Sequence, residues 1–228
     1  PYKCSFCAHR DLQRRKVYKH PSHRAVEEFK FFKTRDVRKV NVVDPVFNME
    51  PDYLGILESL TEIEAEYQVS LQTRFENIRG EQGQRFLDVC GELNVCLEFG
   101  LQSIVEEECV AINRRNNVAH IERILEVLNT KGIDYEVSLI YGLPGQTLTS
   151  FERSIDFLRA RRCAVVKAYP LMLLKGTELW VQQEKWGFRE EVLGPYHIPV
   201  VVKSDSFNQR EWNEMRMLAD SLAPVERY

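Results

Sequence analysis

Two cysteines near the start of the sequence are the first residues whose spacing suggests chemistry. Cys4 and Cys7 are separated by two residues, and a tight loop of that length brings both sulfurs to one side. Thiolates are ligands of zinc and of iron–sulfur clusters. Three histidines lie near the pair in sequence, at His9, His20 and His23. A Cys/His zinc site therefore stays open as an alternative, as do two incidental thiols. A thioredoxin-like dithiol is disfavoured because no strand followed by a helix encloses the pair.

The other four cysteines are predicted to be structural. Cys90, Cys96 and Cys109 fall in apolar periodic segments, and Cys163 opens a strand-like run. Free cysteine is commonly buried in this way. The chain is also too large and too apolar to need disulfides, which favours a reducing, cytoplasmic setting.

Composition and charge narrow the class of protein. Of 228 residues, 44% are hydrophobic and 29% charged, which is typical of a globular protein with a sizeable core. The net charge of −3 does not favour general nucleic-acid binding. No signal peptide is visible, and no apolar run is long enough to span a bilayer. One local basic stretch contains Arg10, Arg14, Arg15, Lys16, Lys19, His20, His23 and Arg24. It is predicted to be a solvated loop, with phosphate or nucleic-acid contact as the alternative.

Extended and helical patterns alternate along the chain. Strands are predicted at 39–43, 68–73, 95–101, 135–141 and 164–171, and helices at 52–66, 84–93, 118–130, 147–161 and 209–222. This alternation favours a parallel sheet with right-handed crossovers, either doubly wound or closed as a barrel. In both cases ligands bind at the carboxyl ends of the strands. The unusual residues at those ends are Asp44, Gln72, Gln102, Gly142 and Pro170.

Taken together, these landmarks resemble the radical S-adenosylmethionine (SAM) enzymes. That family carries the motif CxxxCxxC after its first strand, and residues 1–7 (PYKCSFC) match its last seven positions. The first cysteine is then expected one residue before Pro1, outside this sequence. Phe6 matches the aromatic residue before the third cysteine. The resemblance implies that Cys4 and Cys7 hold a [4Fe–4S] cluster, whose fourth iron binds the amino and carboxylate groups of SAM.

Further motifs extend the resemblance to about residue 179. Residues 98–103 (EFGLQS), 112–114 (INR) and 139–147 (LIYGLPGQT) are similar to the branch of coproporphyrinogen oxidase and the Elp3-like proteins. Residues 43–48 (VDPVFN) and 174–177 (LKGT) are similar to the branch with an N-terminal cobalamin-binding domain. The implied fold is α/β, a partial (β/α)6 TIM-like barrel with a C-terminal helical extension. The implied domains are a core barrel over 1–179 and an extension over 180–228 that packs on it.

The resemblance also implies cofactor contacts. Gln102 would offer an amide to the ribose or methionine part of SAM. Arg114 would pair with the methionine carboxylate, which suits the forked guanidinium. The backbone from Ile140 to Gly145, which includes Gly142, would approach the adenine, since glycine lacks a Cβ that would obstruct it. The simpler alternatives are a satisfied buried glutamine, a solvated arginine and an ordinary Gly-Pro turn. Arg115 is adjacent to Arg114, so a match shifted by one residue stays open as well.

Three positions depart from the coproporphyrinogen-oxidase pattern. Gln72 stands where that branch often has a glutamate, and Ser138 stands where it has an aspartate. Both retain a polar group toward the cofactor but not a carboxylate. Asp44 with Pro45 replaces a Gly-Gly-Glu motif. Asp44 is still able to accept from the methionine amino group, and an Asx turn is its alternative interpretation.

The implied reaction is reductive cleavage of SAM to a 5′-deoxyadenosyl radical, which takes hydrogen from a substrate that the sequence does not identify. The implied partners are an electron donor such as flavodoxin or ferredoxin and, in the second branch, cobalamin held by an upstream domain; no membrane is expected. No residue is assigned to substrate catalysis. With two of three thiolates, these 228 residues alone are expected to hold the cluster poorly. A zinc-containing binding module using Cys4 and Cys7 is the alternative function. A barrel enzyme binding phosphate near residues 142–147 ranks last, because Pro144 removes one N–H donor.

Overall fold

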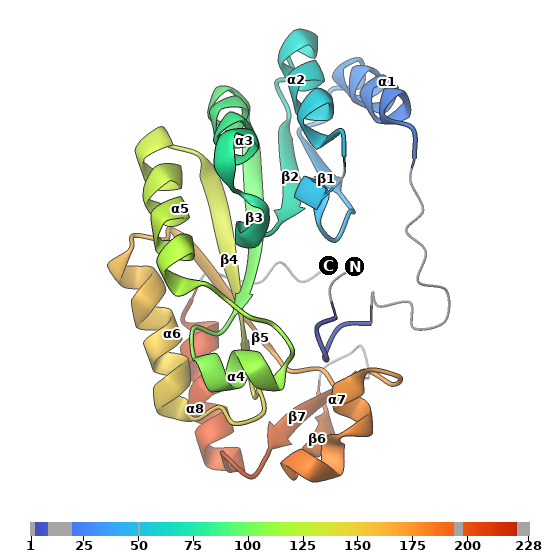
Figure 1. Cartoon of the computed structure of the whole chain (residues 1–228). Helices are drawn as coiled ribbons and strands as arrows, with labels where there is room; N and C mark the ends of the chain where they lie inside the picture. Colours follow the sequence, from blue (N-terminus) through green and yellow to red (C-terminus); the bar gives the residue numbers. More distant parts are fainter. Residues whose placement is uncertain (1–2, 9–19, 50, 194–197, 223–228) are drawn as a thin grey trace. The chain divides into compact units, whose positions relative to one another are not determined.

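The computed structural model describes residues 3–8, 20–49, 51–193 and 198–222. Its main sheet has five parallel strands in the order β1-β2-β3-β4-β5 (Figure 1). They are β1 (Lys39–Val42), β2 (Gln68–Thr73), β3 (Val95–Gln102), β4 (Asp134–Tyr141) and β5 (Val165–Pro170). Among the residues described, β1 and β5 are the two edges of the sheet and no closed ring forms. The predicted α/β class is confirmed.

The chain divides into two compact units. The first unit comprises Pro1–Val17, Leu101–Asn116 and Val137–Tyr228, and the second comprises Tyr18–Gly100 and Asn117–Glu136. Strands β3 and β4 each pass from one unit into the other. The predicted domain boundary at residue 179 stays a prediction.

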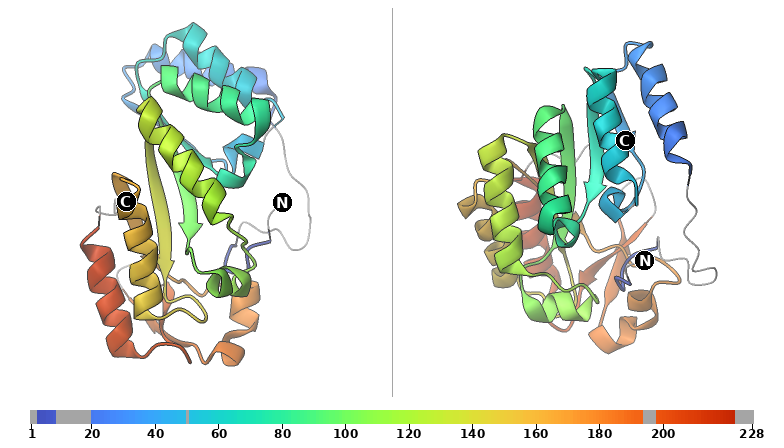
Figure 2. Two further views of the ribbon diagram at one scale, coloured as in Figure 1. Left: turned by 60° about the vertical axis from the view of Figure 1, so that its left-hand side comes forward. Right: turned by 45° about the horizontal axis from the view of Figure 1, so that its top comes forward.

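Besides β1 and β2, the second unit contains α-helices. They are α1 (Ser22–Lys33), α2 (Tyr53–Ile63), α3 (Gly80–Glu92) and α5 (Val118–Lys131), with short 3-10 helices η1 (Phe47–Met49) and η2 (Phe75–Asn77). Figure 2 shows α1, α2 and α3 in succession. Buried leucines recur at helical spacing in α2, at Leu57 and Leu60, and form the apolar face of that helix. Gly132 ends α5 with φ +66°, as its sequence position predicted.

The first unit contains the ends of β3 and β4, all of β5 and the C-terminal region. Its other elements are α4 (Glu106–Ala111), α6 (Leu148–Ala160), α7 (Glu178–Val181), η3 (Gln183–Trp186), β6 (Arg189–Val192), β7 (Pro199–Lys203) and α8 (Gln209–Asp220). The start of α6 is fixed by Thr147, which forms a capping box with Ser150. The extension expected to be helical also contains the antiparallel pair β6 and β7. The N–H of Val201 in β7 donates to Leu171 O at 2.9 Å, directly after β5.

Side chains alternate along β3 and β4, as the period of a strand requires. In the first unit, Leu101, Leu139 and Tyr141 are buried, whereas Gln102, Ser138 and Ile140 between them are half-buried. The half-buried positions are the ones for which the resemblance implied cofactor contacts. In the described residues, no helix has the length and apolarity needed to cross a membrane.

Candidate functional site

Residues 4–7 form a tight turn, here called the cysteine turn, that is anchored on both sides. The N–H of Cys7 donates to Cys4 O at 3.2 Å. The N–H of buried Ser5 donates to Ile112 O at 2.9 Å, and Ser5 O accepts from the N–H of Leu179 at 3.0 Å. Cys4 is buried and Cys7 half-buried, as is Phe6 between them. The two thiols are therefore held on one short loop, as their spacing predicted.

Residues 112–116, here called the connecting segment, join the cysteine turn to the end of β3. Asn113 Nδ2 donates to Lys3 O at 2.8 Å. At the other end, Asn116 Nδ2 donates to both Leu101 O and Ser103 O, each at 2.8 Å. These two carbonyls flank Gln102. One short segment thus fixes the cysteine turn and the backbone around Gln102 together.

Arg114 extends from the connecting segment to a cysteine sulfur. Its side chain is largely buried, with 7% of the residue exposed, and Nη1 donates to Cys4 Sγ at 3.9 Å. Its backbone N–H donates to Cys109 O at 2.8 Å. A guanidinium is always cationic and presents several N–H donors, so it suits a thiolate and other anionic groups around it. A solvated arginine, the simpler alternative, is not what the structure shows.

Gln102 ends β3 in a strained backbone conformation. Its φ is +70°, in the left-handed region that residues other than glycine, asparagine and aspartate rarely adopt. Such conformations persist only where the surroundings enforce them, and they cluster at functional sites. Here the surroundings are the two hydrogen bonds from Asn116 to the adjacent carbonyls.

Residues 142–145, here called the glycine turn, follow β4. Gly142 has φ +86° and is buried, and a Cβ there would lie 3.3 Å from Val201 O. The backbone conformation therefore favours glycine, and a larger residue would also crowd Val201 O. The side chain of Gln146 stabilises the turn through hydrogen bonds with its backbone groups. Its Oε1 accepts from the N–H groups of Gly142 at 2.7 Å and Leu143 at 3.2 Å, and its Nε2 donates to Ile140 O at 3.1 Å.

A buried carboxyl connects the glycine turn with the end of β3. Glu108 on α4 is 1% exposed, and its Oε2 accepts from Ser103 Oγ at 2.6 Å and from Gln146 Nε2 at 3.3 Å. Ser103 Oγ in turn accepts from the N–H of Val105 at 2.9 Å. Burial raises the pKa of Glu108, and the hydrogen bonds that it accepts partly offset this rise. Sequence reasoning did not single out Glu108 or the side chain of Gln146.

Two residues that the resemblance linked to the cofactor lie in the second unit. Asp44 Oδ1 accepts from the N–H of Val46 at 2.8 Å, which is the Asx turn considered as its alternative. Gln72 on β2 is exposed and is in register with Glu98 on β3. Their roles toward the cofactor stay predictions.

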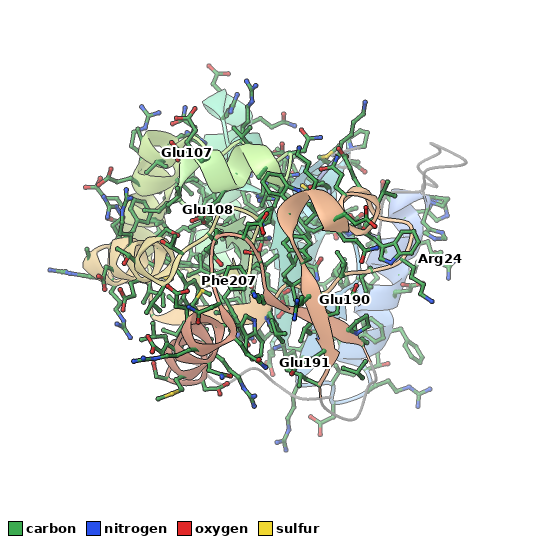
Figure 3. The ribbon with its side chains drawn as sticks, turned by 90° about the horizontal axis from the view of Figure 1, so that it is seen from below. Arg24, Glu107, Glu108, Glu190, Glu191 and Phe207 are labelled. Atoms are coloured by element: carbon green, nitrogen blue, oxygen red, sulfur yellow. The ribbon has the colours of Figure 1, made fainter. Side chains whose placement is uncertain are left out.

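The remaining cysteines fit structural roles. All six cysteines are free, and burial raises the pKa of Cys109 to about 11. In the parts of the chain that the structure describes, no three His, Cys, Asp or Glu side chains gather in a way that could hold a metal. This includes His20 and His23. His9 and the basic residues from Arg10 to Lys19 lie outside the described residues. Arg24, which Figure 3 labels, belongs to α1, and its Nε pairs with Glu28 Oε1 at 2.9 Å.

A cavity of about 480 Å³ lies in the second unit between α3 and α5. Residues along both helices line it, among them His120 and Arg123. None of the residues predicted to contact a cofactor lines this cavity. The predicted chemistry in the first unit therefore depends on strand ends and turns rather than on this cavity.

A family model described as the radical SAM superfamily matches residues 1–158. This is well over half of the chain, and the structure has the α/β fold of that superfamily. The chain belongs to the radical SAM superfamily of enzymes. The family as a whole implies SAM and a [4Fe–4S] cluster.

Two sequence relatives extend the comparison. The tRNA-2-methylthio-N(6)-dimethylallyladenosine synthase of Syntrophotalea carbinolica is 20% identical over 250 residues, covering 93% of this chain and 56% of the relative. An uncharacterized protein of Methanocaldococcus jannaschii is 27% identical over 116 residues, covering 49% of this chain and 35% of the relative. The chain thus spans about a third to a half of the length of these relatives.

Solved structures of similar fold include two enzymes. The radical SAM methyltransferase TsrM from Kitasatospora setae, with tryptophan substrate and a SAM analogue bound, has a TM-score of 0.79 at 14% identity, covering 98% of this chain and 50% of that one. Coproporphyrinogen III oxidase from Escherichia coli has a TM-score of 0.60 at 15% identity, covering 96% and 48%. At these identities the likeness concerns the fold.

Proposed function

We propose that this chain is the core of an enzyme that cleaves SAM reductively at a [4Fe–4S] cluster held in part by Cys4 and Cys7. When bound, the cluster and SAM supply a 5′-deoxyadenosyl radical, which abstracts hydrogen from the substrate. The observation that carries the proposal is the connecting segment. It holds the cysteine turn through Ile112 and Asn113, and the backbone around Gln102 through Asn116.

The donor set fits such a cluster. Two thiols lie on one turn whose backbone is hydrogen-bonded within the first unit, and an arginine donates to one of the sulfurs at 3.9 Å. Thiolates and a nearby cation suit an iron–sulfur site because hydrogen bonds to the sulfurs stabilise its negative charge. The third thiolate is proposed at the residue before Pro1.

The residues proposed for SAM each have a defined task. Arg114 attracts the methionine carboxylate, and Gln102 offers its amide to the ribose or methionine part. The carboxyl end of β4 and the glycine turn provide backbone for the adenine. Contacts from Phe6, Asp44, Gln72 and Ser138 belong to the same proposal. Catalytic residues toward the substrate are not assigned, because fold does not determine the substrate.

A cobalamin-dependent reaction is proposed as the finer form of this function. Its support is the fold of TsrM, one of whose structures contains cobalamin and a [4Fe–4S] cluster and has a TM-score of 0.77 to this chain. The sequence motifs at 43–48 and 174–177 point to the same branch. An electron donor such as a flavodoxin or ferredoxin and a cytoplasmic location complete the proposal; the six free thiols support a reducing compartment.

The first experiment uses the complete protein with its native residues before Pro1, purified and reconstituted without oxygen. Iron and sulfide content, the electron paramagnetic resonance of the reduced cluster and formation of 5′-deoxyadenosine from SAM would be measured. Cys4→Ala and Cys7→Ala should each remove most of the iron and lower 5′-deoxyadenosine formation by at least about 100-fold. Cys96→Ala, which changes a half-buried thiol in the second unit, is the matched control and should retain both.

A second experiment tests the SAM contacts by equilibrium binding. Arg114→Ala and Gln102→Ala should weaken SAM binding by about 10-fold or more, since each removes a hydrogen bond to a charged or polar ligand group. Arg115→Ala is the matched control for the neighbouring arginine. A protein without iron after reconstitution, or a cluster-loaded protein that leaves SAM intact on reduction, would reject the proposed function. A complete protein that binds no cobalamin would reject only the finer form.

A further inference from the structure

The clearest feature that the proposed function leaves unused is the buried carboxyl of Glu108. It lies in the first unit, on α4, and its hydrogen bonds from Ser103 and Gln146 involve neither the cysteine turn nor a residue proposed to contact SAM. It contacts Ser103, directly after Gln102, at 2.6 Å. It also contacts Gln146, whose side chain holds the glycine turn, at 3.3 Å. One oxygen atom, Oε2, accepts both hydrogen bonds.

Resting on the proposed function, we infer that Glu108 is a positioning residue for the adenosine part of SAM. Its carboxyl oxygen sets the spacing between the end of β3, which carries Gln102, and the glycine turn after β4. Glu108 does this without touching the ligand, through Ser103 on one side and Gln146 on the other.

The hydrogen bonds form a continuous path between the glycine turn and the backbone that follows Gln102 at the end of β3. From Gly142 the path runs through its N–H to Gln146 Oε1 at 2.7 Å, then from Gln146 Nε2 to Glu108 Oε2 at 3.3 Å. It continues from Glu108 to Ser103 Oγ, while Ser103 O accepts from Asn116 Nδ2 at 2.8 Å. Every side chain of the path except Asn116 is buried. A shift of either turn therefore breaks a hydrogen bond that water cannot replace.

The choice of a carboxyl at this place is costly for stability. Burying an acid is unfavourable unless its oxygens are fully hydrogen-bonded, and apolar replacements of buried ionic groups are often neutral or stabilising. The Glu108 carboxyl also interacts with Ser150 and with the charge of Arg153, both in α6, and both interactions lower its pKa. Its hydrogen bonds from Ser103 and Gln146 join the end of β3 to the glycine turn, which an apolar side chain could not do.

Both turns also contain backbone that must be held in place. Gln102 has φ +70° and Gly142 has φ +86°. Left-handed backbone at a non-glycine residue relaxes unless the surrounding contacts enforce it. The carboxyl of Glu108, which contacts Ser103 after β3 and Gln146 after β4, supplies such a constraint.

The adjacent residue Glu107 provides a natural control. It has the same side chain on the same helix but is exposed to solvent, whereas Glu108 is buried; Figure 3 labels the two neighbours on α4. A substitution at Glu107 changes the charge and the helix propensity of α4 in the same way as one at Glu108. It leaves the hydrogen-bond path intact.

The test uses the complete, cluster-loaded protein and three probes: SAM, 5′-deoxyadenosine and L-methionine. Affinities would be measured well below each variant's melting temperature, which separates positioning from loss of fold. Glu108→Ala should weaken SAM and 5′-deoxyadenosine by about 10-fold, and leave L-methionine within about twofold. Glu108→Gln should retain affinity within about threefold, because its amide oxygen can take the place of Oε2 and accept from both donors. Glu107→Ala should match the wild type.

Three outcomes would overturn the inference while leaving the proposed function standing. They are unchanged nucleoside affinity in Glu108→Ala, equal loss for the nucleoside and L-methionine, and an equal effect of Glu107→Ala. If Glu108→Ala does not fold, Glu108→Asp takes its place. Its carboxyl is one methylene too short to reach Gln146, so it should weaken nucleoside binding by about fivefold, and full affinity would reject the inference. A cluster-loaded wild type that binds no SAM would instead reject the proposed function, and the inference with it.

Discussion

Both units join neighbouring strand ends through buried polar side chains, but with different groups. In the second unit, Asn48 after β1 donates through Nδ2 to Arg74 O at 3.0 Å and accepts at Oδ1 from the N–H of Arg74 at 3.2 Å, directly after β2. One neutral amide is sufficient there. In the first unit, the ends of β3 and β4 are joined by Ser103, Glu108 and Gln146 together. The more elaborate join includes the only buried carboxylate among the residues described.

The two units also place left-handed backbone differently. In the second unit, Glu64 and Gly132 adopt positive φ where α2 and α5 end, which is the common way to close a helix. In the first unit, Arg162 and Gly187 adopt it after helices in the same way, but Gln102 and Gly142 adopt it where strands end, at residues proposed to contact SAM. The comparison suggests that the second unit is built mainly for stability, whereas the first accepts strain for binding. Four predictions test that difference.

The largest effect is expected for Gln146→Leu in the first unit. This change leaves the buried N–H groups of Gly142 and Leu143 without their acceptor. Each such loss costs about 1–3 kcal/mol, so the free energy of unfolding should fall by about 3 kcal/mol. Urea denaturation monitored by circular dichroism measures it. A loss below about 1 kcal/mol would show that the glycine turn does not depend on this side chain.

Asn48→Ala in the second unit should lower the free energy of unfolding by less, about 2 kcal/mol, because one amide joins the two strand ends there. The comparison predicts a further contrast: SAM affinity at a temperature well below melting should stay within twofold. Equilibrium binding on the cluster-loaded protein measures it. A loss of affinity as large as that of a first-unit variant would break the proposed division of roles.

The pH dependence of stability should separate Glu108 from Glu107. Because burial raises the folded-state pKa of Glu108 above its ordinary value of 4.5, the folded protein binds this proton more tightly than the unfolded chain. The contribution of Glu108 to the free energy of unfolding is therefore fully present below about pH 4.5, and it is lost as pH rises through the pKa of Glu108 in the folded state. The stability of wild type relative to Glu108→Gln should fall with rising pH, by at most about 1.4 kcal/mol per pH unit. The same comparison with Glu107→Gln should be nearly flat.

The smallest effect concerns left-handed backbone. Glu64→Gly and Gln102→Gly should each raise the free energy of unfolding by about 1 kcal/mol, because glycine adopts positive φ without steric cost. Only Gln102→Gly should also weaken SAM binding, since it removes the amide. Thermal melts and binding isotherms together measure both. Equal SAM affinity in the two variants would remove Gln102 from the proposed site.

Much of the fold could be predicted from sequence because apolar periodicity is a local property. β2 was predicted with its observed bounds, and α5 with its glycine stop. Elements without such a pattern were missed. α1 follows the basic stretch, and its first residues were assigned to a loop. All four residues of β6 are exposed, and their pairing with β7 shifts register between Arg189 and Glu190, so no alternation identifies that strand.

The candidate site was predictable only in part, for a physical reason. Cys4, Cys7, Gln102 and Arg114 stand in recognisable motifs, whereas the partners that hold them depend on tertiary contacts. Glu108 is one of three consecutive glutamates, and sequence composition treats the three alike. Its place four residues before buried Ile112 and next to buried Cys109 is the one signal that it lies on the apolar face of α4. Gln146 lies within the motif at 139–147, but the sequence pattern assigned its side chain no role.

The hydrogen bond from Leu179 to Ser5 bears on how this polypeptide can be shortened. Leu179 is the second residue of α7, so a cut after residue 179 would remove the second half of this short helix. It would also remove Val201 and Trp212, which close the space behind Gly142. The tail is consequently part of the packing behind the glycine turn. The shortest fragment expected to keep the two thiols in register runs through Asp220, and exchanging tails between relatives should alter the packing of the turn proposed for the adenine.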